Sequence, residues 1–85
     1  MKKDKVEQVL RVIAIFDALS QSRGEYRLGQ IVDWSTMSRA TVDRYLVRMV
    51  GMKLIDQSTG VYAGKDCRLF KMTDDGLQLL QLLER

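Results

Sequence analysis

The sequence predicts a mainly α-helical fold with one small β-hairpin, in the order helix, helix, helix, hairpin, helix. Three observations support this fold class. Apolar residues recur at helical spacing through the first half of the chain and again near its end. Between these regions, residues 67–72 alternate in side-chain character, which is typical of a strand. The chain has no proline, so glycine and small polar residues mark the breaks between elements.

The first helix is expected over residues 4–20, where apolar residues follow the i, i+3, i+4, i+7 pattern. These residues are Val6, Val9, Leu10, Ile13 and Phe16. A second apolar strip lies beside the first and consists of Val12, Ile15 and Leu19. After a break at residues 21–24, a short second helix is expected over 28–34, followed by a turn at 35–37.

The third helix is expected over residues 39–52. Ser38 suits its N-cap, because the hydroxyl accepts a hydrogen bond from a backbone N–H that the helix leaves unpaired. The inward stripe of this helix is Val42, Leu46 and Met49.

The hairpin is expected over residues 54–72. Its first strand begins at Leu54-Ile55, a turn follows at 58–60, residues 61–66 form a loop with Gly64 near its tip, and the second strand covers 67–72. The last helix is expected over 74–85. Thr73 caps it, and Asp74 and Asp75 favour its positive N-terminal end.

Length and composition favour one domain spanning residues 1–85. A chain of 85 residues holds one small core and leaves no room for an effector-sensing domain of ordinary size. Hydrophobic residues make up 46% and charged residues 29%, the balance of a folded protein. The longest apolar stretch, residues 12–16, is far shorter than the ~20 residues of a membrane span, and no signal peptide is recognisable. We therefore expect a cytoplasmic protein that makes no membrane contact.

Residues suited to catalysis or metal binding are scarce. The chain has no histidine and a single cysteine, Cys67, which excludes His-based triads, a zinc ligand set and an intrachain disulfide. The acidic residues have no metal-loop spacing, and no glycine-rich phosphate loop is present. We expect a protein that is not an enzyme and that uses no metal, cofactor or small-molecule ligand.

Positive charge is concentrated in the middle of the chain. Residues 1–26 hold five basic and four acidic residues (+1), residues 27–71 hold eight and four (+4), and residues 72–85 hold one and three (−2), which gives the net charge of +3. A phosphate backbone would attract such a region. Charge alone favours an ordinary solvated surface, so the DNA-binding interpretation depends on the motif.

Residues 28–55 carry the informative motif, two short helices joined by a tight turn, which is the geometry of a helix-turn-helix. Small and polar residues open the second helix and allow it to enter the major groove of DNA. Arg39 suits a bidentate contact to guanine, and Ala40 or the Thr41 methyl group suits contact with a thymine methyl. Arg44 and Arg48 lie at i, i+4 on one flank, a spacing suited to successive phosphates.

Three segments resemble parts of known regulator families. Ser38-Arg39-Ala40-Thr41-Val42, with Arg44, Leu46, Met49 and Leu54-Ile55, resembles the recognition-helix-to-strand passage of bacterial winged helix-turn-helix regulators. Met72-Thr73-Asp74-Asp75-Gly76 resembles the strand-to-helix signature that follows the wing in many of them. The first helix resembles the start of the DNA-binding domain of the IclR group and of MarR-like proteins.

The resemblance covers about Val6 to Leu83 and implies a DNA-binding regulator, usually a homodimer, with its wing near the minor groove or the backbone. Lys65 and Arg68 are then wing contacts to phosphate or plain surface charges. Two positions depart from the family pattern, because glycine is common where this chain has Thr36 and Lys53. The expected DNA-contacting residues are Ser38, Arg39, Ala40, Thr41, Arg44, Arg48, Lys65 and Arg68.

The apolar strips of the first and last helices have two interpretations. Both belong to the core, or their excess is buried in a two-fold dimer, since one stripe per helix is enough for the core of so small a domain. We favour the homodimer. Its expected interface is Val12, Ile15, Leu19, Leu79, Leu82 and Leu83.

The aromatic residues are expected to be structural. Trp34 and Tyr45 suit core or half-buried packing, and Tyr26 and Tyr62 suit the surface with no ligand.

The function predicted from the sequence is a regulator of transcription that binds double-stranded DNA, with helix 39–52 in the major groove and hairpin 54–72 as the wing. It is expected to be a repressor, because a bare DNA-binding domain that occludes a promoter represses. Its expected source is a bacterium or a bacterial virus or plasmid. The rival is a winged-helix adaptor that binds another regulator or a polymerase. That rival has no need of Arg39, Arg44 and Arg48 together.

Overall fold

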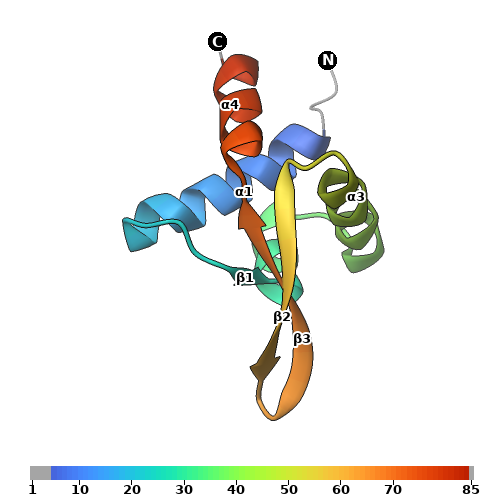
Figure 1. The fold of residues 1–85 in the computed structure, drawn as a ribbon. Coiled ribbons are helices and arrows are strands. Elements are labelled where there is room, and N and C mark those ends of the chain that lie inside the picture. Colours follow the sequence, from blue (N-terminus) through green and yellow to red (C-terminus); the bar gives the residue numbers. More distant parts are fainter. Residues whose placement is uncertain (1–4, 85) are drawn as a thin grey trace.

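The structure, a computed structural model, describes residues 5–84. Its elements are α1 (Lys5–Ser20), β1 (Tyr26–Arg27), α2 (Leu28–Ser35), α3 (Arg39–Gly51), β2 (Ile55–Tyr62), β3 (Lys65–Met72) and α4 (Asp74–Leu83). The predicted fold class and element order are confirmed, with the two-residue strand β1 added. The ends expected at Asp4 and Arg85 lie outside the described residues. The β2–β3 hairpin projects from one end of the helical body and α4 from the opposite end (Figure 1).

The three strands form an antiparallel sheet in the order β1-β3-β2. In the hairpin, Ile55 lies opposite Met72 at the base and Tyr62 lies opposite Lys65 at the tip. The two residues between the strands, Ala63 and Gly64, both have positive φ, 52° and 77°. Two such residues form the type I′ turn, whose twist matches the twist of the strands.

The turn predicted at residues 58–60 is wrong, because β2 runs through this segment, and most of the loop predicted over 61–66 is strand. A Cβ on Gly60 would lie 2.6 Å from Cδ1 of Leu69, so the glycine gives that side chain room on the facing strand. The prediction of Gly64 at the tip is confirmed.

The core lies where the four helices meet the base of the sheet. The predicted inward stripe of α3 is confirmed, since Val42, Leu46 and Met49 are each 0% exposed. Phe70 of β3 is also fully buried and belongs to the same cluster. The other fully buried side chains are Val9, Leu10, Ile13, Ile31, Ile55 and Met72.

Two aromatic predictions are wrong. Tyr26 is 9% exposed instead of lying on the surface, because its ring stacks on Phe16 and its hydroxyl donates a 2.6 Å hydrogen bond to Asp17. Burial, together with this hydrogen bond, holds the pKa of Tyr26 above its ordinary value. Trp34 is 53% exposed and touches the edge of Phe16, so it is more solvated than the core or half-buried packing that was expected.

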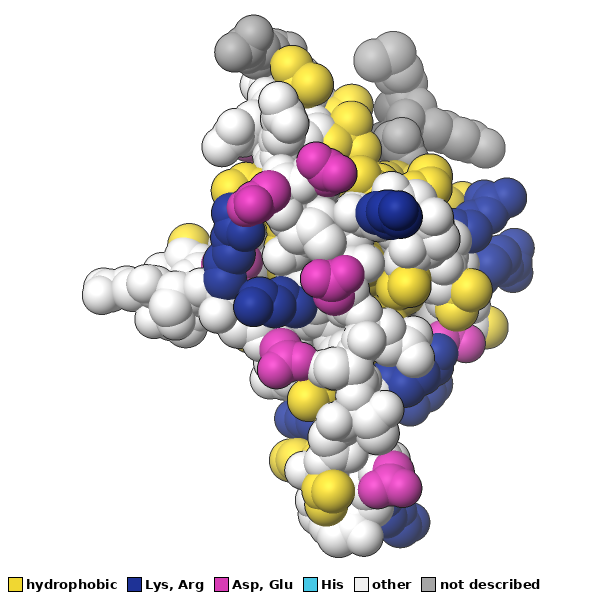
Figure 2. Space-filling view, viewed as in Figure 1, with side chains coloured by type: hydrophobic (Ala, Val, Ile, Leu, Met, Phe, Trp, Pro, Cys, Tyr) yellow, Lys and Arg dark blue, Asp and Glu magenta, His cyan; other side chains and the backbone are white. Residues whose placement is uncertain are grey.

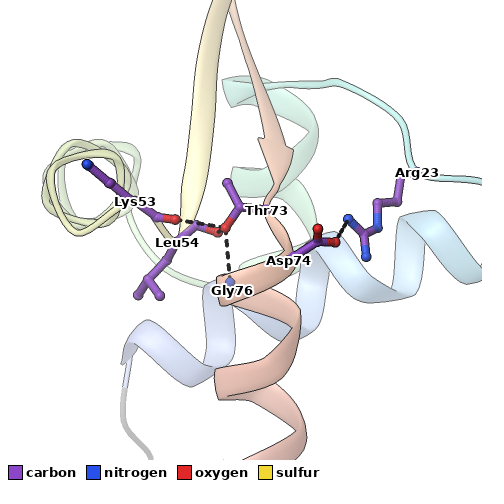
Figure 3. A network of polar contacts seen from close by, with 6 residues as sticks. All are labelled: Arg23, Lys53, Leu54, Thr73, Asp74 and Gly76. Carbon is purple, nitrogen blue, oxygen red and sulfur yellow. Dashed lines mark hydrogen bonds and ion pairs between the residues drawn. The ribbon is translucent and has the colours of Figure 1, made fainter.

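A polar junction joins the start of the hairpin to the start of α4 (Figure 3). The Thr73 hydroxyl lies 2.8 Å from the carbonyl oxygens of both Lys53 and Leu54, to which it donates, and it accepts the backbone N–H of Gly76 at 3.0 Å. The predicted N-cap is therefore confirmed. Because one hydroxyl bonds both segments, Thr73 fixes where α4 leaves the sheet.

Candidate nucleic-acid interface

The turn between α2 and α3 closes without glycine. Thr36 adopts the left-handed conformation, with φ 60° and ψ 15°, that the departure from the family pattern requires. Ser35, which is 6% exposed, supports this turn, because its hydroxyl donates to the Val32 carbonyl at 3.0 Å and accepts from the Met37 N–H at 3.2 Å. Sequence reasoning missed this role of Ser35. Lys53, the second position where the family commonly has glycine, also has a positive φ, 62°.

The first turn of α3 is prepared by Ser38. Its hydroxyl oxygen accepts the Thr41 N–H at 3.3 Å, as predicted for the N-cap, and its proton is donated to the Thr41 hydroxyl oxygen at 2.8 Å. Ser38, Arg39 and Ala40 are exposed and Thr41 is half-buried. The small polar side chains therefore lie at the accessible end of the helix, where the sequence placed the base contacts.

Basic side chains mark the outer side of α3. Arg44 and Arg48 are both exposed. Within residues 5–84 neither makes an ion pair, and Arg48 lies 5.8 Å from the centre of the Tyr45 ring. Figure 2 shows basic side chains gathered on the α3 side of the molecule. Unpaired guanidinium groups on an exposed helix are free to meet phosphates.

A groove of about 530 Å³ separates the hairpin from the starts of α2 and α3. Its lining is cationic, with one acidic residue, Asp66. We call it the cationic groove, because four basic residues line it: Arg27, Arg39, Lys65 and Arg68. The structure thus places Arg39 on the hairpin side of α3, beside the predicted wing residues. Sequence reasoning missed Arg27, because no periodic pattern connects β1 to the tip of the hairpin.

Two contacts hold the hairpin against the helices. Arg68 forms a 2.5 Å ion pair with Asp43 of α3. The two side chains are 37% and 42% exposed, so the pair lies at the surface and neutralises the charge of Arg68 only in part. The guanidinium carbon of Arg27 lies 3.6 Å from the centre of the exposed Tyr62 ring near the hairpin tip, a close cation–π contact. Both join residues far apart in the sequence. The Arg68–Asp43 pair orients the hairpin relative to α3, and the Arg27–Tyr62 contact holds the hairpin tip to the β1 segment before α2.

The six residues predicted for a dimer interface divide into two groups. Val12 is 6% exposed and belongs to the core of its own domain, so it is not available to a partner. Leu79 is half-buried against that core. The other four are exposed: Ile15 38%, Leu19 68%, Leu82 56% and Leu83 40%. Hydrophobic side chains are visible over the α4 end in Figure 2.

The described part of the chain, residues 5–84, has no cluster of three or more side chains suited to holding a metal ion. No helix within the same residues is long and apolar enough to cross a membrane.

The family model of the IclR helix-turn-helix domain matches residues 8–59, which include most of α1, all of β1, α2 and α3, and residues 55–59 of β2. No curated protein matches the chain significantly by sequence.

Solved structures with the same fold include two regulators. BpsR from Bordetella bronchiseptica, whose DNA binding is regulated by 6-hydroxynicotinic acid, has a TM-score of 0.76 at 21% identity; the match covers 96% of this chain and 56% of BpsR. PadR from Bacillus subtilis, solved with operator DNA, has a TM-score of 0.75 at 17% identity, covering 94% of this chain and 46% of PadR. The chain therefore spans about half the length of these two proteins.

A third solved structure is closer in size. Stf76 from the Sulfolobus islandicus plasmid-virus pSSVx has a TM-score of 0.60 at 19% identity, and the match covers 86% of this chain and 92% of Stf76. At these identities the similarity establishes a shared fold.

Proposed function

The chain belongs to the IclR helix-turn-helix family of DNA-binding winged-helix transcription regulators, which are not enzymes, and we propose that it binds double-stranded DNA sequence-selectively with α3 in the major groove. The observation that carries this proposal is the exposed, unpaired basic side of α3, which continues into the cationic groove beside the hairpin. In this proposal the β2–β3 hairpin is the wing. The alternative function, a protein-interaction adaptor, is not favoured, because the family binds DNA and the exposed basic surface suits phosphate.

The proposed contacts follow from the placement of the side chains. Arg44 and Arg48 bind phosphates from the outer side of α3, while Ala40 and Thr41 lie at the end that meets base edges. Lys65, exposed beside the hairpin tip, binds phosphate from the wing. Arg68 contributes mainly by holding the wing to Asp43 and only secondarily as a charge.

The proposed active form is a homodimer that uses the exposed apolar residues of α1 and α4. A single domain buries little DNA surface, and a two-fold pair brings two recognition helices to successive major grooves. PadR binds operator DNA. We propose that this protein likewise occupies an operator, represses by occluding it, needs no small-molecule ligand, and acts in the cytoplasm of a bacterium.

Replacing Arg44 or Arg48 by Ala is expected to weaken binding to all duplex sequences alike, because phosphate contacts carry no sequence information. Each replacement should lower the slope of log K against log salt by about one unit. Titration of a fluorescent duplex between low and moderate salt measures this slope. Gln81→Ala on α4 is the control and should leave it unchanged. An unchanged slope in both arginine variants would remove them from the interface.

Replacing Arg39 by Ala separates two kinds of contact. A bidentate contact to guanine predicts a loss of about 1–3 kcal/mol on the preferred site and relaxed preference at one base pair. The position of Arg39 in the cationic groove also allows phosphate binding, for which the loss is the same on every sequence. We expect base-specific loss, measured on the preferred duplex and on single-base variants. Uniform loss across these duplexes would assign Arg39 to the backbone.

A further inference from the structure

The outward face of α3 carries an apolar residue that the basic motif does not explain. Val47 is 55% exposed, whereas Leu46, the residue before it, is 0% exposed. Its neighbours Arg44, at i−3, and Arg48, at i+1, are both exposed. Val47 is therefore an aliphatic side chain with more than half of its surface in water, one helical turn after the exposed Arg44.

Helix geometry gives this position a meaning. With about 100° between successive residues, Ala40, Arg44 and Val47 at i, i+4 and i+7 share one stripe. This stripe lies opposite the buried stripe formed by Val42, Leu46 and Met49. The line of α3 farthest from the core thus presents methyl groups from Ala40 in the first turn and from Val47 two turns later. When α3 lies in the major groove, Ala40 and Val47 on this line face the base edges. Arg44 lies on the side of the line toward Arg48, and its long side chain reaches from there to the phosphates at the edge of the groove.

The major groove presents one apolar group to a protein, the C5 methyl of thymine, which 5-methylcytosine also carries. An aliphatic side chain cannot donate or accept a hydrogen bond, so it distinguishes bases only through such a methyl group. We infer that Val47 packs against the C5 methyl of a thymine and makes the operator selective at that base pair. This inference rests on the proposed function, because it requires α3 to occupy the groove.

The test uses the full chain and duplexes selected by it from a random pool. Each thymine of the preferred duplex is replaced in turn by uracil, which removes the methyl group and keeps the base pair. At one thymine per half-site, uracil should weaken binding of the unmodified protein about fourfold, the value of one buried methyl group. Val47→Ala should bind the thymine duplex about fourfold or more weakly, and should not distinguish thymine from uracil at that position. Replacing the same base by 5-methylcytosine, paired with guanine, should be tolerated better than cytosine by the unmodified protein alone.

Val61→Ala is the matched control, because Val61 is 73% exposed but lies in the wing. It should keep the fourfold preference for thymine at the Val47 position. Val47 is more than half exposed and alanine is a better helix former than valine, so thermal unfolding should show the Val47→Ala variant folded.

If uracil at every position affects the unmodified protein and Val47→Ala equally, Val47 does not contact the methyl group and the inference is wrong. Salt-dependent binding of the unmodified protein to the selected duplex would still support the proposed function. If the protein selects no duplex at all, the proposed function and the inference both fail.

Discussion

Gly76→Ala should destabilise the protein by about 3 kcal/mol or more, because the added Cβ has no space. A Cβ at this position would lie 2.0 Å from the carbonyl oxygen of Leu54 and 3.0 Å from its carbon. That oxygen is held in place, because it accepts two hydrogen bonds from Thr73, one from the backbone N–H at 3.2 Å and one from the hydroxyl at 2.8 Å. Relief requires α4 to move off the sheet and break the junction in Figure 3. Overpacking against fixed backbone costs at the upper end of the usual range.

Urea unfolding followed by circular dichroism measures the effect as a lower midpoint. Gly51→Ala is the control, because no atom lies within 4 Å of a Cβ there and the residue ends α3 on the exposed side. That variant should be as stable as the unmodified protein or up to about 1 kcal/mol more stable. Equal midpoints for Gly76→Ala and the unmodified protein would contradict the packing described at this junction.

Leu82→Asp should give folded monomers that bind operator DNA about 100-fold or more weakly. Leu82 is 56% exposed, so a carboxylate there costs the isolated domain little. In a two-fold interface the same carboxylate is buried without a partner, which is strongly unfavourable. The affinity falls because two linked recognition helices gain from their effective concentration, and a monomer loses that gain. Sedimentation equilibrium at micromolar concentration, followed by operator titration, measures both effects.

Gln81→Asp adds the same charge to α4 about 100° away from Leu82 and should preserve both the dimer mass and the affinity. A monomer mass for the unmodified protein, with and without DNA, would contradict the dimer and leave the leucines of α4 without that role.

The sequence was sufficient for the parts of the fold that local periodicity determines. Val42, Leu46 and Met49 recur at i, i+4 and i+7, and all three are buried in α3 as predicted. The N-caps at Ser38 and Thr73 were also predictable, because a side-chain hydroxyl before a helix satisfies a backbone donor within a few residues.

The wing was harder to predict, because its strands leave the core. Ser58, Thr59 and Gly60 have turn-like composition, yet they lie in β2, where pairing with Leu69, Arg68 and Cys67 decides the conformation. Strand β1 has two residues and is defined only by its pairing with β3, so no local sequence pattern predicts it. Tertiary pairing overrode composition in both cases.

In the candidate interface too, features set by a local sequence pattern were predictable and features set by tertiary contacts were not. The basic and polar residues of α3 were predictable from one helical motif. The cation–π contact between Arg27 and Tyr62 and the ion pair between Asp43 and Arg68 join segments that meet only in the folded protein. Val12 was assigned to a dimer because its spacing matches Ile15, but the spacing does not tell how wide the buried face of α1 is.

Selection of bound sequences from a random duplex pool tests the central claim, that α3 binds DNA sequence-selectively, most directly. The account predicts that the unmodified protein enriches an inverted repeat with half-site centres about one helical turn apart or a multiple of it. It also predicts that the double variant Arg44→Ala/Arg48→Ala, selected in parallel at the same salt concentration, recovers much less DNA, because its affinity is lower for every duplex. Absence of any enriched sequence for the unmodified protein, or equal recovery of DNA by both proteins, would contradict it.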